Sequence, residues 1–183
     1  MQEQRLGKLN IIVAIYGLKN VTAQVSSLVN DGIPQTLNFA VTNRVIGEDG
    51  WRGQRKSITI VYNYDGGDPH VATAKEGDIV AINPGTIKTP QPVIEEAAVN
   101  KNGLSVLAAS YGLDNVTYRV KKMISPYNTL SFRIDNTLFG DPWHGVAKTL
   151  VIVLGHANEI TAVEIFTERE ICYIDLNDVI SAV

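Results

Sequence analysis

Two loops of this chain bring an indole ring together with glycines and polar side chains, the mixture of groups that a carbohydrate-binding surface uses. The loop at residues 136–145 reads Asn-Thr-Leu-Phe-Gly-Asp-Pro-Trp-His-Gly, and residues 43–53 form a related loop earlier in the chain. This composition predicts stacking of a sugar ring on an exposed tryptophan, with polar neighbours as hydrogen-bond partners. The candidate ligand-binding residues are Trp51, Arg52, Asn136, Asp141, Trp143 and His144. The opposite interpretation stays open from sequence alone: both indoles fold inward and pin their loops over the edge of a sheet.

Residues for catalysis or metal binding do not form a recognisable pattern in the sequence. His70, His144 and His156 lack the spacing of metal ligands, and the single cysteine, Cys172, excludes a disulfide framework and a thiolate metal site. Asp141 could orient His144 as a general base, but no nucleophile with a local signature accompanies the pair. We therefore expect no catalytic residue, no metal and no cofactor, and a protein that is not an enzyme.

Other charged side chains are expected to be solvated. Arg52, Arg55 and Lys56 would form a basic rim beside the first loop. Charges near a late strand would protect a sheet edge from uncontrolled pairing. They are Glu164, Glu168, Arg169 and Glu170.

The overall charge and hydropathy exclude several classes of protein. The 183 residues include 16 basic and 19 acidic side chains, a net charge of −3, which is not the basic footprint of a nucleic-acid-binding protein. No apolar run reaches the length of a membrane span, and the polar start lacks the apolar core of a signal peptide. These features favour a cytoplasmic protein without nucleic-acid or membrane partners.

The elements that must position the two loops are themselves repeated. Tyr-Gly-Leu-Lys-Asn-Val-Thr at residues 16–22 returns as Tyr-Gly-Leu-Asp-Asn-Val-Thr at residues 111–117, and the later residues follow in the same order. Repetition at fixed order indicates one supersecondary unit used twice. Each copy is small enough to be marginally stable alone, so we expect the copies to pack together.

Short runs rich in β-branched and aromatic residues, bounded by glycine, asparagine, aspartate and proline, predict about five strands in each copy. The runs of this kind, three in each copy, are residues 9–15, 37–41, 57–64, 105–109, 130–134 and 148–154. No long amphipathic helix is apparent; residues 94–99 are compatible with a short helical turn, and residues 21–29 are ambiguous. The predicted fold is all-β, with two tandem antiparallel β-sandwich-like units packed together. Whether these are separate or interleaved sandwiches stays open.

The turn at the start of each copy has a predictable geometry. Gly17 and Gly112 would adopt a positive φ, and Asn20 would bond the turn backbone. The next two residues, valine and threonine, would open a strand. The predicted boundaries are 9–82 for the first repeat, 83–103 for the connection, 104–175 for the second repeat and 176–183 for a C-terminal tail.

The repeated unit resembles a known family. Tyr-Gly followed by Val-Thr, a hydrophobic strand and then a Gly-Asp-Pro-Trp-x-Gly-x-x-Lys loop is similar to an uncharacterised β domain found at the C-terminus of a mitochondrial J-domain protein and in small microbial proteins. Residues 111–175 match best, whereas the first copy has Gly-Glu-Asp-Gly-Trp in place of Gly-Asp-Pro-Trp. The chain lacks the His-Pro-Asp tripeptide of a J domain, so the resemblance implies an interaction or scaffold module and not chaperone recruitment.

Two functional hypotheses follow. The first is a non-enzymatic, lectin-like interaction protein that binds a carbohydrate or protein surface through its tryptophan loops, where two weak sites on one molecule gain affinity through effective concentration. The alternative is a structural protein that self-assembles into an oligomer, filament or lattice, with the apolar tail at residues 176–183 passed to a neighbouring copy. Both hypotheses are compatible with a homo-oligomer.

Overall fold

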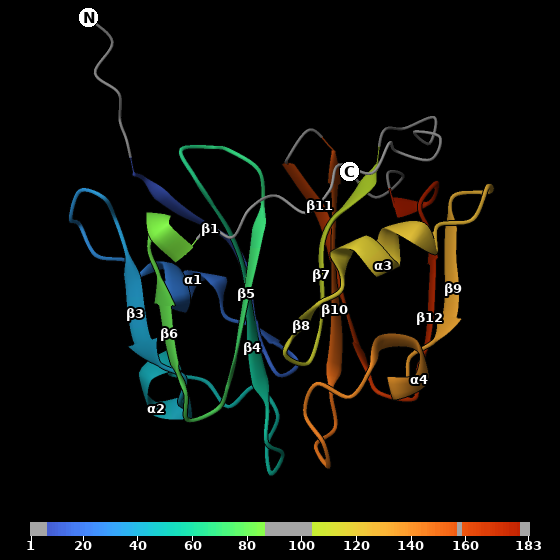
Figure 1. Ribbon diagram of the computed structural model, residues 1–183, viewed down its shortest axis with the longest axis horizontal. Coiled ribbons are helices and arrows are strands. Elements are labelled where there is room, and N and C mark those ends of the chain that lie inside the picture. Colours follow the sequence, from blue (N-terminus) through green and yellow to red (C-terminus); the bar gives the residue numbers. More distant parts are fainter. Residues whose placement is uncertain (1–6, 87–103, 157–158, 180–183) are drawn as a thin grey trace, which may run out of the picture. The chain divides into compact units, whose positions relative to one another are not determined.

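The computed structural model describes residues 7–86, 104–156 and 159–179, and these residues form a mostly β chain with short helices. The chain divides into two compact units, Met1–Thr89 and Pro90–Val183, which Figure 1 colours blue to green and yellow to red. Both units follow the same order of elements, so the predicted all-β class with two repeated antiparallel units is confirmed.

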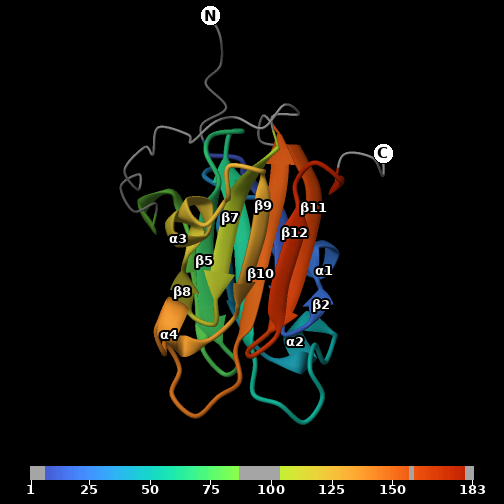
Figure 2. The same ribbon diagram turned by 90° about the vertical axis from the view of Figure 1, so that its right-hand side faces the viewer.

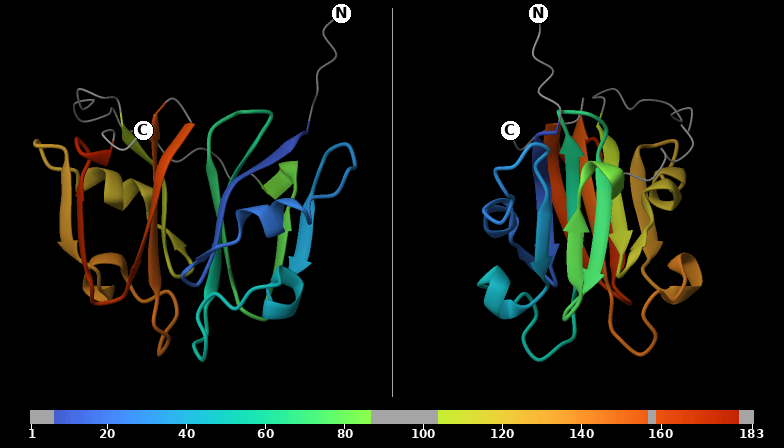
Figure 3. Two further views of the ribbon diagram at one scale, coloured as in Figure 1. Left: turned by 180° about the vertical axis from the view of Figure 1, so that it is seen from behind. Right: turned by 60° about the vertical axis from the view of Figure 1, so that its left-hand side comes forward.

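The first unit contains a four-stranded and a two-stranded antiparallel sheet. The larger sheet has the order β2-β1-β4-β5, and β3 pairs with β6 in the smaller one. The left panel of Figure 3 shows these sheets as separate layers. The elements are β1 (Leu9–Tyr16), β2 (Lys19–Asn20), α1 (Thr22–Ser26), β3 (Leu37–Ala40), α2 (Asn43–Ile46), β4 (Ser57–Tyr64), β5 (His70–Lys75), β6 (Ile79–Ile82) and the 3-10 helix η1 (Pro84–Thr86).

The second unit repeats this topology strand by strand. Its larger sheet has the order β11-β10-β7-β8, and β12 pairs with β9 in the smaller sheet (Figure 2). The elements are β7 (Ser105–Tyr111), β8 (Asp114–Asn115), α3 (Thr117–Lys122), β9 (Thr129–Arg133), α4 (Asn136–Phe139), β10 (Thr149–His156), β11 (Glu159–Thr167) and β12 (Ile171–Asp175). The described residues thus give six strands per unit, whereas about five were predicted. The two-residue strands β2 and β8 were not predicted.

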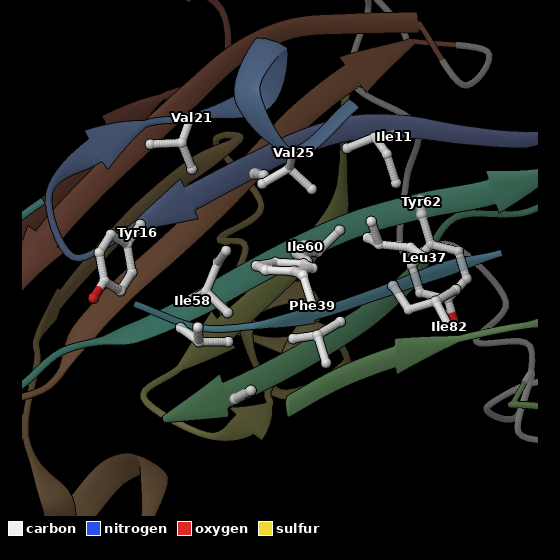
Figure 4. Packing of buried hydrophobic residues seen from close by; sticks show 14 of the residues in the cluster. Ile11, Tyr16, Val21, Val25, Leu37, Phe39, Ile58, Ile60, Tyr62 and Ile82 are labelled. Carbon is white, nitrogen blue, oxygen red and sulfur yellow. The ribbon is translucent and has the colours of Figure 1, made fainter. Parts of the chain in front are cut away.

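Each unit has its own apolar core between its two sheets. A strand covered on one face buries alternate residues, and the smaller sheets show this pattern: Leu37 and Phe39 of β3 are buried whereas Asn38 between them is exposed. In Figure 4 the side chains of Phe39, Tyr16 and Ile60 lie in one cluster of the first unit. An equivalent cluster fills the second unit. The unit is therefore a small sandwich, and its loops emerge at the ends of the strands.

The prediction that Val21 and Thr22 open a strand is wrong. They begin helix α1, and the equivalent segment of the second unit begins α3. Val21 and Val25 are both fully buried, and their spacing of four places them on one helical face toward the core. The chain turns over the sheet because the Thr22 hydroxyl accepts the N–H of Ala14 at 2.9 Å and the Val21 N–H donates to the Ala14 carbonyl at 2.8 Å.

Two predicted segments run beyond the described residues. The connection at residues 83–103 is described only to residue 86, and the helical turn expected at residues 94–99 lies outside the description. The tail at residues 176–183 is described to residue 179. In this part Leu176 is fully buried in the core of the second unit, and Val179 packs against that core. The start of the tail therefore belongs to the core of its own unit. None of the helices in the described stretches is long and apolar enough to cross a membrane.

Candidate functional site

Each unit buries one lysine at the base of its tryptophan loop, defined as residues 47–56 in the first unit and 140–148 in the second. The side chains of Lys56 and Lys148 are only 3% and 2% exposed. Lysine is rarely buried without partners, since an unpaired ammonium loses its hydration energy. The predicted solvated rim is therefore wrong for Lys56, whereas Arg52 and Arg55 are exposed as expected.

Lys56 has anionic and neutral acceptors on several sides. Its ammonium lies 3.0 Å from the Asp49 carboxylate and 3.2 Å from the Glu76 carboxylate, and it donates to the Gln54 carbonyl at 3.2 Å. It also lies 5.2 Å from the centre of the Tyr16 ring. Asp49 is near the start of the loop and Glu76 follows β5, so one cation ties the loop to a distant turn.

Lys148 repeats this arrangement in the second unit. Its ammonium lies 2.9 Å from Asp141 and 3.3 Å from Glu168, and it donates to the Val146 carbonyl at 2.9 Å. The Tyr111 ring centre is 6.0 Å away. The prediction that Glu168 is an exposed, edge-protecting charge is wrong, because its side chain is 16% exposed and paired with Lys148.

A buried tyrosine joins each lysine to the helix before the loop. The Tyr16 hydroxyl donates to the Asn43 side-chain oxygen at 2.9 Å, and Tyr111 donates to Asn136 at the same distance. Burial, reinforced by nearby carboxylates, raises the pKa of both phenols well above the usual range. The hydroxyls therefore stay neutral donors, and the oxygen of the candidate ligand residue Asn136 is engaged within the protein.

The Tyr-Gly turn contacts the loop directly. Gly17 and Gly112 have φ of 59° and 56°, and Asn20 accepts the Thr22 N–H at 3.0 Å, so the predicted turn geometry is confirmed. The Leu18 N–H donates to the Gly50 carbonyl at 3.0 Å. A Cβ at Gly50 would overlap the Tyr16 carbonyl oxygen, so the backbones approach more closely there than a side chain permits. The first loop is consequently fixed against this turn.

Both tryptophans are half-buried. This exposure is intermediate between the two interpretations of the sequence, an exposed indole and an indole folded inward. Each of these residues keeps part of its surface accessible to solvent. The backbone N–H of Trp51 donates to Asp49 at 3.2 Å, and the carbonyl of Trp143 accepts from Lys148 at 3.4 Å. The backbone of each tryptophan therefore contacts the ion cluster of its own unit.

The residue after each tryptophan is exposed. His144 has a side chain that is 98% exposed, and its Nδ1 lies 3.1 Å from Asp141. Arg52 is the exposed counterpart in the first unit, close enough to Asp49 to interact with it electrostatically. Hydrogen bonding to the lysines holds the pKa of the Asp49 and Asp141 carboxyls below their usual range, so both are anionic at neutral pH.

The structure thus groups the predicted site residues by unit. Asn136, Asp141, Trp143 and His144 are linked through Tyr111 and Lys148 in the second unit, and Trp51 and Arg52 belong to the first. The sequence reasoning missed the buried members of each cluster. They are Tyr16, Lys56 and Glu76 in the first unit and Tyr111, Lys148 and Glu168 in the second. The signal was their presence at matching positions in both copies, which ordinary charged surface residues need not show.

The chemistry of each cluster is that of a structural ion pair at the base of a loop that carries a half-buried tryptophan. Within the described residues, no three histidine, cysteine, aspartate or glutamate side chains gather as metal ligands would. In each unit the lysine ammonium lies within salt-bridge distance of both carboxylates, so an organic cation already stands where these carboxylates could otherwise hold a metal ion.

Comparisons with known proteins add no family assignment. No protein-family model matches the chain, and neither the curated proteins nor the solved structures include a significant match. The structure itself shows that the chain contains two similar halves, each with a four-stranded and a two-stranded antiparallel sheet.

Proposed function

We propose that this chain is a non-enzymatic binding protein with one ligand site on the tryptophan loop of each unit, and that its ligands are carbohydrates. The observation that carries the proposal is the repeated combination of a partly accessible indole with a loop base fixed by a buried lysine. An ion cluster of this kind stabilises a loop without presenting a reactive group. It is suited to holding a recognition surface in place.

A fixed loop favours binding because it loses little conformational freedom when the ligand arrives. The accessible part of an indole offers an apolar face to the C–H groups of a sugar ring, and its N–H is a hydrogen-bond donor. Arg52 and His144 directly follow the two tryptophans in the chain and are exposed, so they are available as polar partners for hydroxyl groups. The resemblance of the repeat to a J-protein-associated β domain also implies an interaction module.

Two sites on one chain would increase the apparent affinity for a ligand with several epitopes. The sites would differ in their exposed polar group, because Arg52 presents a guanidinium, which can pair with a carboxylate through two parallel hydrogen bonds, whereas the equivalent His144 presents an imidazole. We therefore expect the first site to favour acidic sugars more strongly than the second at neutral pH.

The test is a glycan array followed by calorimetric titration of the strongest ligand. Trp51→Ala and Trp143→Ala should each remove one site and weaken binding to a multivalent ligand about tenfold or more, and the double variant should not bind. Tyr127→Ala is the matched control, since this aromatic side chain is 83% exposed and lies outside both loops. Thermal melting confirms that each variant is folded.

A blank array, or binding that survives both tryptophan substitutions in folded variants, would contradict carbohydrate recognition by these loops. A blank array together with a protein partner captured by the wild type, and lost in the double variant, would replace sugar by protein as the ligand class.

A further inference from the structure

We infer that copies of this chain assemble head to tail, with the outer face of the β9–β12 sheet of one copy docking on the outer face of the β3–β6 sheet of the next. The inference goes beyond the proposed loop sites, because it uses other elements. Both smaller sheets turn one face to their own core and the other outward.

The outer face of β9–β12 projects large side chains. Ile171 and Tyr173 of β12 are 70% and 65% exposed. Their cross-strand partners are Arg133 and Ser131 of β9, both exposed, and direct partners share a face. An aliphatic and an aromatic side chain next to each other on one exposed face are typical of an interaction surface.

The outer face of β3–β6 carries smaller side chains. Ile79, which is 68% exposed, pairs with Ala40, and Ala81 pairs with Asn38. Apart from Ile79, these four residues are small, and neither strand contains a charged residue. A face without charged side chains can be buried without the cost of desolvating an ion.

The two faces carry the same residue at one equivalent position and residues of complementary size at the next. Glu76 and Glu168 are equivalent, since each pairs with the buried lysine of its unit. Ile79 and Ile171 each come three residues after these glutamates, so they are equivalent too, and they are similarly exposed. At the equivalent position next along the strand, the first unit has Ala81 and the second has Tyr173. A large side chain on one face thus meets a small one on the other, which favours contact between unlike faces over contact between like faces.

The charges at the ends of the two faces are also complementary. Arg133 lies opposite Ile171 on the second face, and Asp78 directly precedes Ile79 at the corresponding end of the first. Glu170 is the equivalent of Asp78 in the second unit, and its carboxylate accepts the Thr167 N–H at 2.6 Å within its own turn. Arg133 and Asp78 are both exposed residues, and within the described parts of the chain neither makes an ion pair. Docking with these ends together would pair them.

Because every copy carries both faces, this contact does not close on itself unless the copies form a ring, and assembly grows with concentration. Faces of two short strands are smaller than a standard interface, so each contact is weak, with a dissociation constant of about 0.1 to 1 mM. Because the two faces fit each other in size and charge, the occupant of each face is a second copy of this chain, held by shape and one charge pair.

The test is absolute molar mass by light scattering on the full chain, across concentrations from about 10 μM to about 1 mM, which bracket the expected affinity. The wild type should rise steadily above its monomer mass of 20.0 kDa. Asp78→Arg and Arg133→Asp should each prevent this rise, and the double variant should restore it because the charge pair is re-formed in reverse. Asp114→Arg, an exposed carboxylate on β8, is the matched control and should assemble like the wild type.

A second arm tests the head-to-tail geometry. Ile79→Lys disables one face and Tyr173→Lys the other, so each variant alone should stay monomeric while an equimolar mixture forms dimers and nothing larger. A monomeric wild type at all concentrations, single variants that assemble normally, or a double charge variant that fails to assemble would overturn the proposal.

Discussion

The ammonium nitrogen of Lys148 and the carboxylate of Asp141 lie 2.9 Å apart beneath the tryptophan loop of the second unit, near the loop's two ends. The ion pair therefore closes the loop into a ring. The same ammonium reaches Glu168 at 3.3 Å, which ties that ring to the turn between β11 and β12. The first unit repeats this relationship between Lys56 and Asp49 at 3.0 Å, so it is a property of the repeated unit.

Replacing Lys56 with methionine should destabilise the first unit strongly. The variant keeps most of the side-chain volume but leaves Asp49 and Glu76 facing each other without a cation. We expect a loss of about 2 to 4 kcal/mol in the free energy of unfolding, measured by urea titration. Lys19→Met is the control, because its pair with Glu48 spans 3.8 Å with side chains 59% and 38% exposed, and its loss should stay below about 0.5 kcal/mol. Equal losses in the two variants would refute a structural role for the buried lysine.

Acid should weaken the fold through the loop carboxylates. Lys148 holds the folded-state pKa of Asp141 below its usual range, so the stability from this group is complete above the unfolded-state pKa of about 3.9 and is lost as pH falls through the folded-state value. Asp141→Asn should therefore be less stable than the wild type at pH 7, and the difference should shrink as pH falls below about 4. Urea midpoints across this range provide the measurement, with Asp114→Asn as an exposed control. Parallel curves for wild type and Asp141→Asn would show that the pair contributes nothing.

Substitutions at two glycines of the first loop test two effects separately: steric crowding at Gly50 and backbone strain at Gly53. Gly50 has no room for a Cβ against the Tyr16 carbonyl, whereas Gly53 has φ of 74° and open space around it. Gly50→Ala should cost about 2 kcal/mol or more, since the loop and the turn must move apart. Gly53→Ala should cost about 1 kcal/mol from its left-handed backbone alone. Urea unfolding of both variants measures the difference, and a smaller loss for Gly50→Ala would mean that the loop is not held against the turn.

Cys172 offers a probe of the second unit, because it is the single cysteine of the chain and is fully buried. Burial raises the pKa of its thiol to about 12, so alkylation of the folded protein at neutral pH should be slow and should proceed through opening of the unit. Lys148→Met should accelerate labelling about ten- to a hundredfold, because a loss of about 1.4 to 2.8 kcal/mol raises the open population by that factor. Lys122→Met, an exposed lysine of the same unit, should leave the rate unchanged. An unchanged rate in Lys148→Met would contradict a role for the ion cluster in holding the unit closed.

Much of the fold could be predicted because its causes are local. The strand at residues 57–64 follows from a run of β-branched and aromatic residues, and it coincides with β4. Gly17 could be assigned a positive φ because a tight turn follows a strand there. Helix α1 was missed because its signal, Val21 and Val25 on one face, is short and competes with the strand preference of β-branched residues.

The candidate site was only partly predictable. Trp143 and Asp141 stand in one short loop, and the sequence indicated both as site residues. Lys56 was predicted to be an ordinary solvated charge, because nothing local distinguishes a lysine that meets a glutamate from one that meets water.

By itself, the amino-acid sequence determined the repeat, the all-β class, the turn geometry and the position of the tryptophan loops, since these depend on residue types and on spacing within a few positions. Only the tertiary structure decided that Lys56 is buried, that Glu76, twenty residues later, completes its environment, and that Trp51 is half-covered. The physical reason is that the energy of a buried charge depends on groups brought together from distant parts of the chain, and the fold alone sets which groups those are.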